Sequence, residues 1–138
     1  MIEAKTEREW VVRLEDGEDV VGALRRLEGT SAVILAGIGM LRDAELAYWN
    51  GEAYQTHQHV SPSELVSLQG NLALDEEGAR VVHAHACLAA ADGTMAGGHL
   101  VRATVHNTLE MTLLPLTQIS LERRRETNGL VGLHPRTT

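Results

Sequence analysis

The stretch that decides the fold is Val81-Val82-His83-Ala84-His85-Ala86-Cys87-Leu88, followed by Gly97-Gly98-His99-Leu100. Its short apolar and β-branched runs predict two β-strands. Successive side chains of a strand point to opposite faces, so His83 and His85 project side by side. An intervening turn can bring His99 back next to them. Three imidazoles on one face of a sheet form a candidate site for a divalent metal ion.

Other readings of these histidines stay open on the residues alone. The three rings could be core or surface histidines held by hydrogen bonds. Cys87 shares their strand face and could be a fourth ligand or a nucleophile, although a buried, inert cysteine is favoured. Glu110 could orient a ligand, but alternation from Leu100 places it on the face opposite His99. Glu64 and Glu110 are candidate acids or bases by residue type only.

Length and composition describe one ordinary domain. The chain has 138 residues, and 43% of them are hydrophobic, which is enough for a real core. Aromatic residues make up only 3%, without any Phe, so the core must be aliphatic. The single cysteine excludes an internal disulfide and fits a reducing cytoplasm. The N-terminal residues lack a signal-peptide core, and no apolar run approaches a membrane span, so we expect a cytoplasmic protein.

The charge balance argues against nucleic acid as a partner. Lys and Arg total 12 against 19 Asp and Glu, which gives a formal net charge of -7. Binding to DNA depends largely on neutralising phosphates with basic side chains. The one basic cluster, Arg123-Arg124-Arg125, is flanked by acidic residues. We expect it to be a solvated strand end or tail rather than a phosphate clamp.

One helix and many strands are predicted along the chain. Apolar residues recur at helical spacing from Val20 to Leu27, which predicts an amphipathic helix over residues 17–28. Asp16 is its candidate N-cap, and Gly29 ends it. A short helix start at residues 61–66 is possible, although a strand entry is preferred. Strands are predicted at residues 10–14, 31–36, 44–49, 53–59, 64–74, 80–90, 100–114 and 117–122.

This pattern predicts an α+β domain with a mainly antiparallel sheet and one principal helix. The domain is expected to span residues 1–125, and residues 126–138 read as a loosely ordered tail. The segment Gly37-Ile38-Gly39 lacks the third glycine and the following helix of a dinucleotide site, so it is interpreted as a tight turn. His57-Gln58-His59 is interpreted as a pair of exposed loop histidines.

Several ordered motifs together resemble the plants-and-prokaryotes conserved (PPC) domain, a module found with AT-hooks in plant nuclear proteins and alone in bacteria and archaea. The resemblance covers residues 9–115. The motifs that carry it are Arg13-Leu14-Glu15-Asp16-Gly17-Glu18-Asp19-Val20, Ala36-Gly37-Ile38-Gly39, Asp43-Ala44-Glu45-Leu46-Ala47-Tyr48, Glu64-Leu65-Val66-Ser67-Leu68-Gln69-Gly70-Asn71, His83-Ala84-His85-Ala86-Cys87-Leu88-Ala89, Asp92-Gly93, Gly97-Gly98-His99-Leu100 and Leu109-Glu110.

The resemblance implies a homotrimer of α+β domains. It also implies that His83, His85 and His99 match the family's histidine motif, where some prokaryotic members hold a metal, with zinc as the leading choice. Position 87 is typically a small hydroxyl residue in the family, so Cys87 gains no support as a ligand. The Arg-Gly-Arg core of an AT-hook is absent, and a DNA-binding role would rest on the family label alone.

Two functions follow as expectations. The first is a metal-binding, homotrimeric PPC-type domain that acts as a regulatory or interaction module. The second is a metal-dependent enzyme that acts on an unidentified small molecule, because three histidines leave a coordination position open on the metal. The residues name no reaction, and they name no small-molecule ligand.

Overall fold

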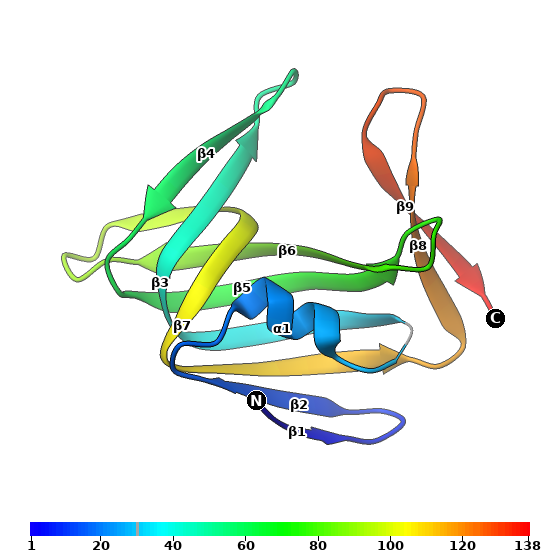
Figure 1. Cartoon of the computed structure of the whole chain (residues 1–138), viewed down its shortest axis with the longest axis horizontal. Coiled ribbons are helices and arrows are strands. Elements are labelled where there is room, and N and C mark those ends of the chain that lie inside the picture. Colours follow the sequence, from blue (N-terminus) through cyan, green and yellow to red (C-terminus); the bar gives the residue numbers. More distant parts are fainter. Residues whose placement is uncertain (30) are drawn as a thin grey trace.

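The computed structural model describes residues 1–29 and 31–138, and within them nine strands and one helix form an α+β domain (Figure 1). Nearly all strand pairs are antiparallel, as predicted, and the one parallel pairing joins β5 to β8. The elements are β1 (Ile2–Lys5), β2 (Trp10–Glu15), α1 (Val20–Arg26), β3 (Ser31–Trp49), β4 (Tyr54–His59), β5 (Ser63–Leu74), β6 (Arg80–Ala89), β7 (Met95–Leu116), β8 (Ile119–Arg125) and β9 (Val131–Thr137).

The sheet runs in the order β1-β2-β7-β3-β5-β8-β9, with β4 added to β3. β6 pairs with both β5 and β7, and these two strands also pair with β3. Four strands therefore close a circuit, and α1 lies across the sheet (Figure 1). The helix buries its apolar side chains, among them Val20 and Leu24, in one core with residues of the central strands. That core is almost wholly aliphatic, as the composition predicts.

The predicted turn at Gly37-Ile38-Gly39 is wrong, because β3 runs without interruption through these residues. The expected strands 31–36 and 44–49 are thus parts of one strand. Its pairing with β7 shifts register between Ile34 and Ala36 and again between Gly39 and Leu41. Gly39 has φ +147°, and a Cβ there would lie 2.1 Å from the carbonyl oxygen of Thr108. The glycines permit a bulged, close strand pairing rather than a chain reversal.

The helix is shorter than predicted and begins later. It spans Val20–Arg26, and Asp19 rather than Asp16 occupies the N-cap position. The Asp16 carboxylate instead accepts a hydrogen bond from the backbone N–H of Asn107, 2.9 Å away. Asp16 therefore ties the start of the α1 segment to β7, a long-range role that helix periodicity cannot reveal.

Most of the expected loose tail, residues 126–138, forms strand β9, which pairs with β8. β8 and β9 form an antiparallel hairpin over residues 119–137, and Gly129 at its turn has φ +82°. Two hairpins rise from the same side of the domain, β3–β4 at one end and β8–β9 at the other, with β6 passing between their bases (Figure 1). The preferred strand entry near residue 63 is confirmed, since β5 begins at Ser63. The described helix is too short to cross a membrane.

Candidate metal centre

Strand pairing places the three predicted histidines together. His83 and His85 lie two residues apart on β6, and His85 is directly opposite His99 in the β6–β7 ladder. The ring centroids are 5.3 Å apart for His83 and His85, 5.1 Å for His83 and His99, and 5.7 Å for His85 and His99. One donor nitrogen from each ring lies within 4.8 Å of the others. The three rings therefore present their nitrogens to one common space, as a shared ion requires.

Glycines allow the close strand approach beneath this cluster. A Cβ on Gly70 of β5 would lie 2.1 Å from the carbonyl oxygen of His83. A Cβ on Gly98, the neighbour of His99, would lie 2.8 Å from the carbonyl oxygen of Ala47 on β3. Both contacts are with backbone, which cannot move aside as a flexible side chain can. The cluster therefore stands on strands that are packed unusually close together.

The surroundings favour neutral imidazole rings. Burial, with smaller contributions from the nearby charges of Arg123 and of the other two histidines, lowers the pKa of His83 to about 4. Burial also lowers the pKa of His99, assisted by His85 and Arg123. A metal ion binds the neutral ring, so near pH 7 protons do not compete for His83. The Nδ1 atom of His99 is buried and lacks a hydrogen-bond partner among the described residues.

Arg123 is a site residue that the sequence did not reveal. The expected solvated strand end is wrong for this side chain, which is only 9% exposed. Its Nη2 lies 2.6 Å from Nδ1 of His83 and donates to Oδ1 of Asn71 at 3.1 Å. The neighbouring Arg124 forms an ion pair with Glu122 at the surface. The one indication in the sequence that Arg123 is buried was strand alternation, which places it on the same face as buried Leu121.

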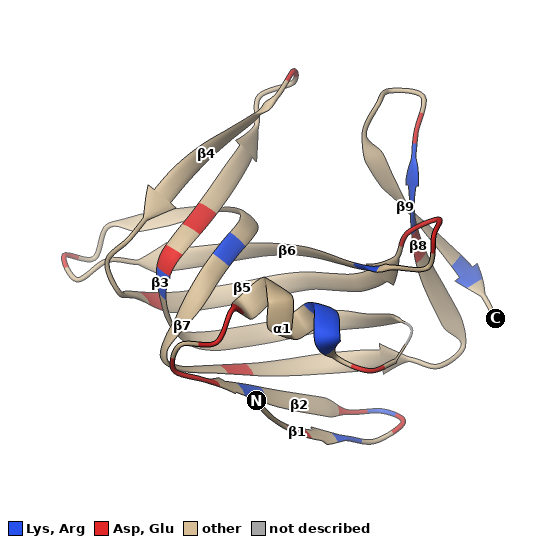
Figure 2. Ribbon diagram, viewed as in Figure 1, with Lys and Arg blue, Asp and Glu red and all other residues tan. Residues whose placement is uncertain are grey.

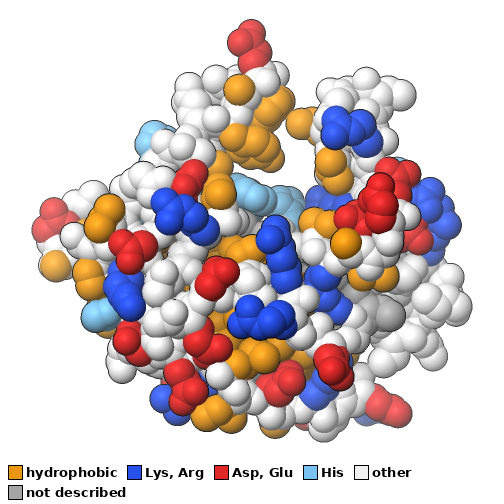
Figure 3. All heavy atoms as spheres, in the orientation of Figure 1, with side chains coloured by type: hydrophobic (Ala, Val, Ile, Leu, Met, Phe, Trp, Pro, Cys, Tyr) orange, Lys and Arg blue, Asp and Glu red, His pale blue; other side chains and the backbone are white. Residues whose placement is uncertain are grey.

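A pocket opens beside the histidine cluster, between the two raised hairpins. Its volume is about 510 Å³, within the usual range for small-molecule sites. Figure 3 shows the hollow, with histidine side chains at its floor and apolar side chains on both flanks. His83, His99 and Arg123 line it together with apolar and aromatic residues from β3, β4, β6 and the β8–β9 hairpin, which are Trp49, Tyr54, Val81, Val82, Leu130 and Val131.

The remaining candidates do not join the cluster. Cys87 is partly buried opposite Gly97 and is not among the grouped donors. Glu64 is exposed on β5, and Glu110 is exposed on β7, where it pairs with Arg13 and Ile38. His57 and His59 lie on β4 rather than in a loop, and His57 is exposed as expected. None of these five side chains belongs to the group of metal-capable donors found within the described residues.

Fold and site together define a class of protein: a small α+β domain with a mainly antiparallel sheet and a three-histidine cluster at the base of a pocket. Residues 1–117 match the family model of the Plants and Prokaryotes Conserved (PCC) domain. The chain belongs to this family, which is the PPC family of the solved structures below. Arg123 and the β8–β9 hairpin lie beyond the residues that the family model matches.

Solved structures of prokaryotic proteins share the fold over nearly the whole chain. A PPC protein from Pyrococcus horikoshii is 28% identical, with a TM-score of 0.85, covering 99% of this chain and 97% of its own. A metal-containing protein from Archaeoglobus fulgidus is 29% identical, with a TM-score of 0.82, covering 92% of this chain and 93% of its own.

A protein from Ralstonia eutropha that carries a DNA-binding label is 23% identical, with a TM-score of 0.85, covering 96% of this chain and 94% of its own. At that identity the likeness concerns the fold alone. No protein of curated function gives a significant sequence match.

Proposed function

We propose that this chain is a zinc-binding PPC domain in which His83, His85 and His99 hold the ion. The observation that carries the proposal is the convergence of three imidazole nitrogens within 4.8 Å on two paired strands. Imidazole is a preferred ligand of zinc, and three histidines leave a fourth position open. The similar protein from Archaeoglobus fulgidus is described as metal-containing, which supports a metal in a protein of this fold without naming which metal.

The residues present fit such an ion. Burial keeps the rings of His83 and His99 neutral near pH 7, and the unpartnered Nδ1 of His99 offers a lone pair or a proton inside the site. Bound zinc would supply Lewis acidity and tie β6 to β7. The three histidines would fix the position of the ion, and the pocket walls would limit access of water to the open position.

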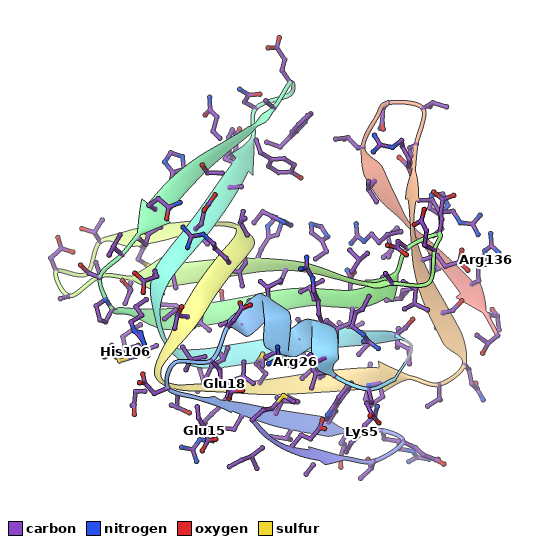
Figure 4. The ribbon with its side chains drawn as sticks, in the orientation of Figure 1. Lys5, Glu15, Glu18, Arg26, His106 and Arg136 are labelled. Carbon is purple, nitrogen blue, oxygen red and sulfur yellow. The ribbon has the colours of Figure 1, made fainter. Side chains whose placement is uncertain are left out.

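Elemental analysis of the purified protein tests the site. We expect about one zinc ion per chain in the wild type and a large loss in His83→Ala and His85→Ala. His106→Ala is the matched control, because His106 lies on β7, as His99 does, but its Nδ1 is 3.9 Å from the Asp16 carboxylate. Figure 4 shows His106 at the end of the sheet away from the β8–β9 hairpin. Absence of stoichiometric metal from the wild type would contradict the proposal.

The domain is further proposed to act in the cytoplasm as a homotrimeric regulatory or interaction module. The single cysteine suits a reducing compartment. Apolar side chains on the sheet face away from the core support self-association, since Val11 is 53% exposed and Ile38 is 59% exposed. Both pair with β7 residues of that outer face, Val11 with Thr112 and Ile38 with Glu110. Exposed apolar side chains on one sheet face are candidates for an interface between chains.

A metal-dependent enzyme is the alternative function, and the pocket of about 510 Å³ beside the cluster is the observation that favours it. None of the described residues lining this pocket is an Asp or a Glu, so no carboxylate base stands among them. The alternative predicts that a screen of small metabolites finds a turnover that chelation removes and zinc restores. A screen without chelator-sensitive turnover would count against it.

A further inference from the structure

Arg123 is a buried cation that has no acidic partner among the described residues. Its side chain is 9% exposed, and it is the one charged side chain that is buried among the described residues. Its hydrogen-bond partners are the carbonyl oxygen of Val131, Oδ1 of Asn71 and Nδ1 of His83. None of the ion pairs among the described residues includes Arg123, and its Nε lacks any partner there. An uncompensated buried charge is costly, so the site favours the arrival of an anion.

The pocket wall explains why the anion should carry an apolar body. Arg123 is the one Lys, Arg, Asp or Glu among its described lining residues. Trp49 and Tyr54 stand on the β3–β4 side, with ring centroids 5.2 Å apart, and Leu130 and Val131 stand on the β8–β9 side. Such walls gain free energy by covering apolar surface of a ligand, while one polar anchor orients it.

Metal binding frees Arg123 to meet that anion. A guanidinium can only donate, so Nδ1 of His83 accepts from Arg123 and the neutral ring carries its proton on Nε2. If Nδ1 of His83 held the ion, its lone pair would no longer accept a hydrogen bond from Arg123. If Nε2 held the ion, the ring proton would sit on Nδ1 and would face Arg123 as a second donor. Either mode breaks the Arg123–His83 hydrogen bond and leaves Nη2 of Arg123 with a free N–H beside the ion.

We propose that this pocket binds a small organic carboxylate with an apolar body, held by Arg123 beside the three histidines, where bound zinc would supply a second positive charge. The inference rests on the proposed zinc site and names the ligand class for it. A carboxylate has two oxygens, so one could accept hydrogen bonds from a guanidinium while the other would lie near a divalent ion. A phosphate dianion would place further oxygens against apolar walls, where the described lining offers no additional cation.

Calorimetric titration with benzoate tests the proposal, using zinc-loaded protein whose metal content has been measured. We expect saturable binding to the wild type and at least about tenfold weaker binding to Arg123→Met. Arg125→Met is the matched control, because Arg125 is exposed on the same strand, and it should bind like the wild type. Benzamide, a neutral molecule of the same shape, should bind much more weakly than benzoate.

A second variant keeps the test independent of any damage that Arg123→Met does to folding. Leu130 lies in the turn of the β8–β9 hairpin and lines the pocket, and its side chain is 37% exposed. Leu130→Glu should leave the melting temperature nearly unchanged and weaken benzoate binding through charge repulsion. Benzoate binding should also depend on zinc: the metal-free wild type should bind benzoate at least about tenfold less tightly than the zinc-loaded protein.

The outcomes separate the two proposals. Zinc at full occupancy without benzoate binding, or with binding that Arg123→Met leaves intact, overturns the carboxylate site and leaves the zinc site standing. Tighter binding of inorganic phosphate than of benzoate also overturns the ligand class. A wild type that holds no zinc contradicts the proposed function and the carboxylate site together.

Discussion

At the scale of single residues, the contact between Arg123 and His83 links two functions of one pocket. The 2.6 Å contact gives Nδ1 of half-buried His83 a hydrogen-bond partner. The same guanidinium lowers the pKa of His83, after the larger effect of burial, and so favours the neutral ring that a metal needs. Arg123 therefore favours the neutral His83 ring that a metal needs, while forming a hydrogen bond that metal binding would break.

This competition predicts that Arg123→Met binds zinc more tightly than the wild type when no carboxylate is present. The substitution removes a positive charge beside the ion and a hydrogen bond that zinc binding must break. We expect a gain of about tenfold or more in zinc affinity, measured by competition with a chromophoric chelator. Arg125→Met serves as the control with unchanged affinity. Weaker zinc binding by Arg123→Met would show that Arg123 supports the metal rather than opposes it.

The low pKa of His83 predicts an acid-sensitive fold in the metal-free protein. The folded ring has a pKa of about 4, whereas the unfolded ring titrates near the ordinary value of about 6.5. Between these values the unfolded chain binds the extra proton, so the free energy of unfolding decreases as the pH falls through this window. Melting temperatures of metal-free wild type and His83→Gln should converge from pH 7 toward pH 4. Parallel curves for the two proteins would contradict this assignment.

At the scale of elements, close strand packing holds the histidines in place. β6 lies between β5 and β7, so His83 faces Asn71 on one neighbour and His85 faces His99 on the other. The β8–β9 hairpin adds Arg123 from a strand that reaches the sheet through the parallel pairing of Leu74 with Glu122. The site therefore depends on contacts among four strands rather than on one local motif.

Gly70→Ala should damage both the fold and the site. Its Cβ would lie 2.1 Å from the carbonyl oxygen of His83 and 2.6 Å from Cα of Ala84, so β5 and β6 must separate. We expect a loss of about 1–3 kcal/mol in the free energy of unfolding and weaker zinc binding. Gly97→Ala is the matched control, since its Cβ would meet its nearest backbone atom at 3.3 Å. Denaturant unfolding should show the larger loss for Gly70→Ala.

At the scale of the whole molecule, one face of the central strands exposes several apolar side chains among polar ones. Val11, Ile38 and Leu114 lie on the outer face of β2, β3 and β7, whereas α1 contributes to the core on the other side. Trimer formation would remove this surface from water, at a gain of roughly 25 cal/mol for each square ångström of apolar area.

Ile38→Glu is predicted to shift the proposed trimer toward monomers, because a charge at a buried interface must be desolvated. Light scattering should report a trimer for the wild type and a smaller particle for the variant. Val60→Glu is a suitable control, since Val60 is 65% exposed in the segment between β4 and β5. A monomeric wild type would contradict the trimer proposal.

The charge distribution predicts weak interaction with DNA. The formal net charge is -7, and Figure 2 shows basic and acidic residues interspersed along the ribbon rather than separated onto two faces. Phosphate contacts require clustered Lys and Arg. Gel-shift assays at low salt should show no retardation of duplex DNA by the wild type. Retardation that disappears with added salt would contradict this prediction.

Local sequence pattern determined a large part of the fold and of the histidine cluster. Alternation fixed the shared face of His83 and His85, and the glycine-containing turn after β6 allowed His99 to return beside them. The aliphatic core, the single helix and most strands also followed from periodicity, because each depends on residues close together in the chain.

Only the tertiary structure decided what depends on distant residues. Arg123 lies forty positions from His83, and its basic neighbours made it resemble a solvated end until β8 turned it inward. Gly37 and Gly39 resembled a turn, but β7 supplied a partner that kept the strand continuous. Residues 131–137 became a strand because β8 offered them hydrogen bonds. The sequence thus specified the three histidines, whereas long-range pairing placed the cation and the pocket beside them.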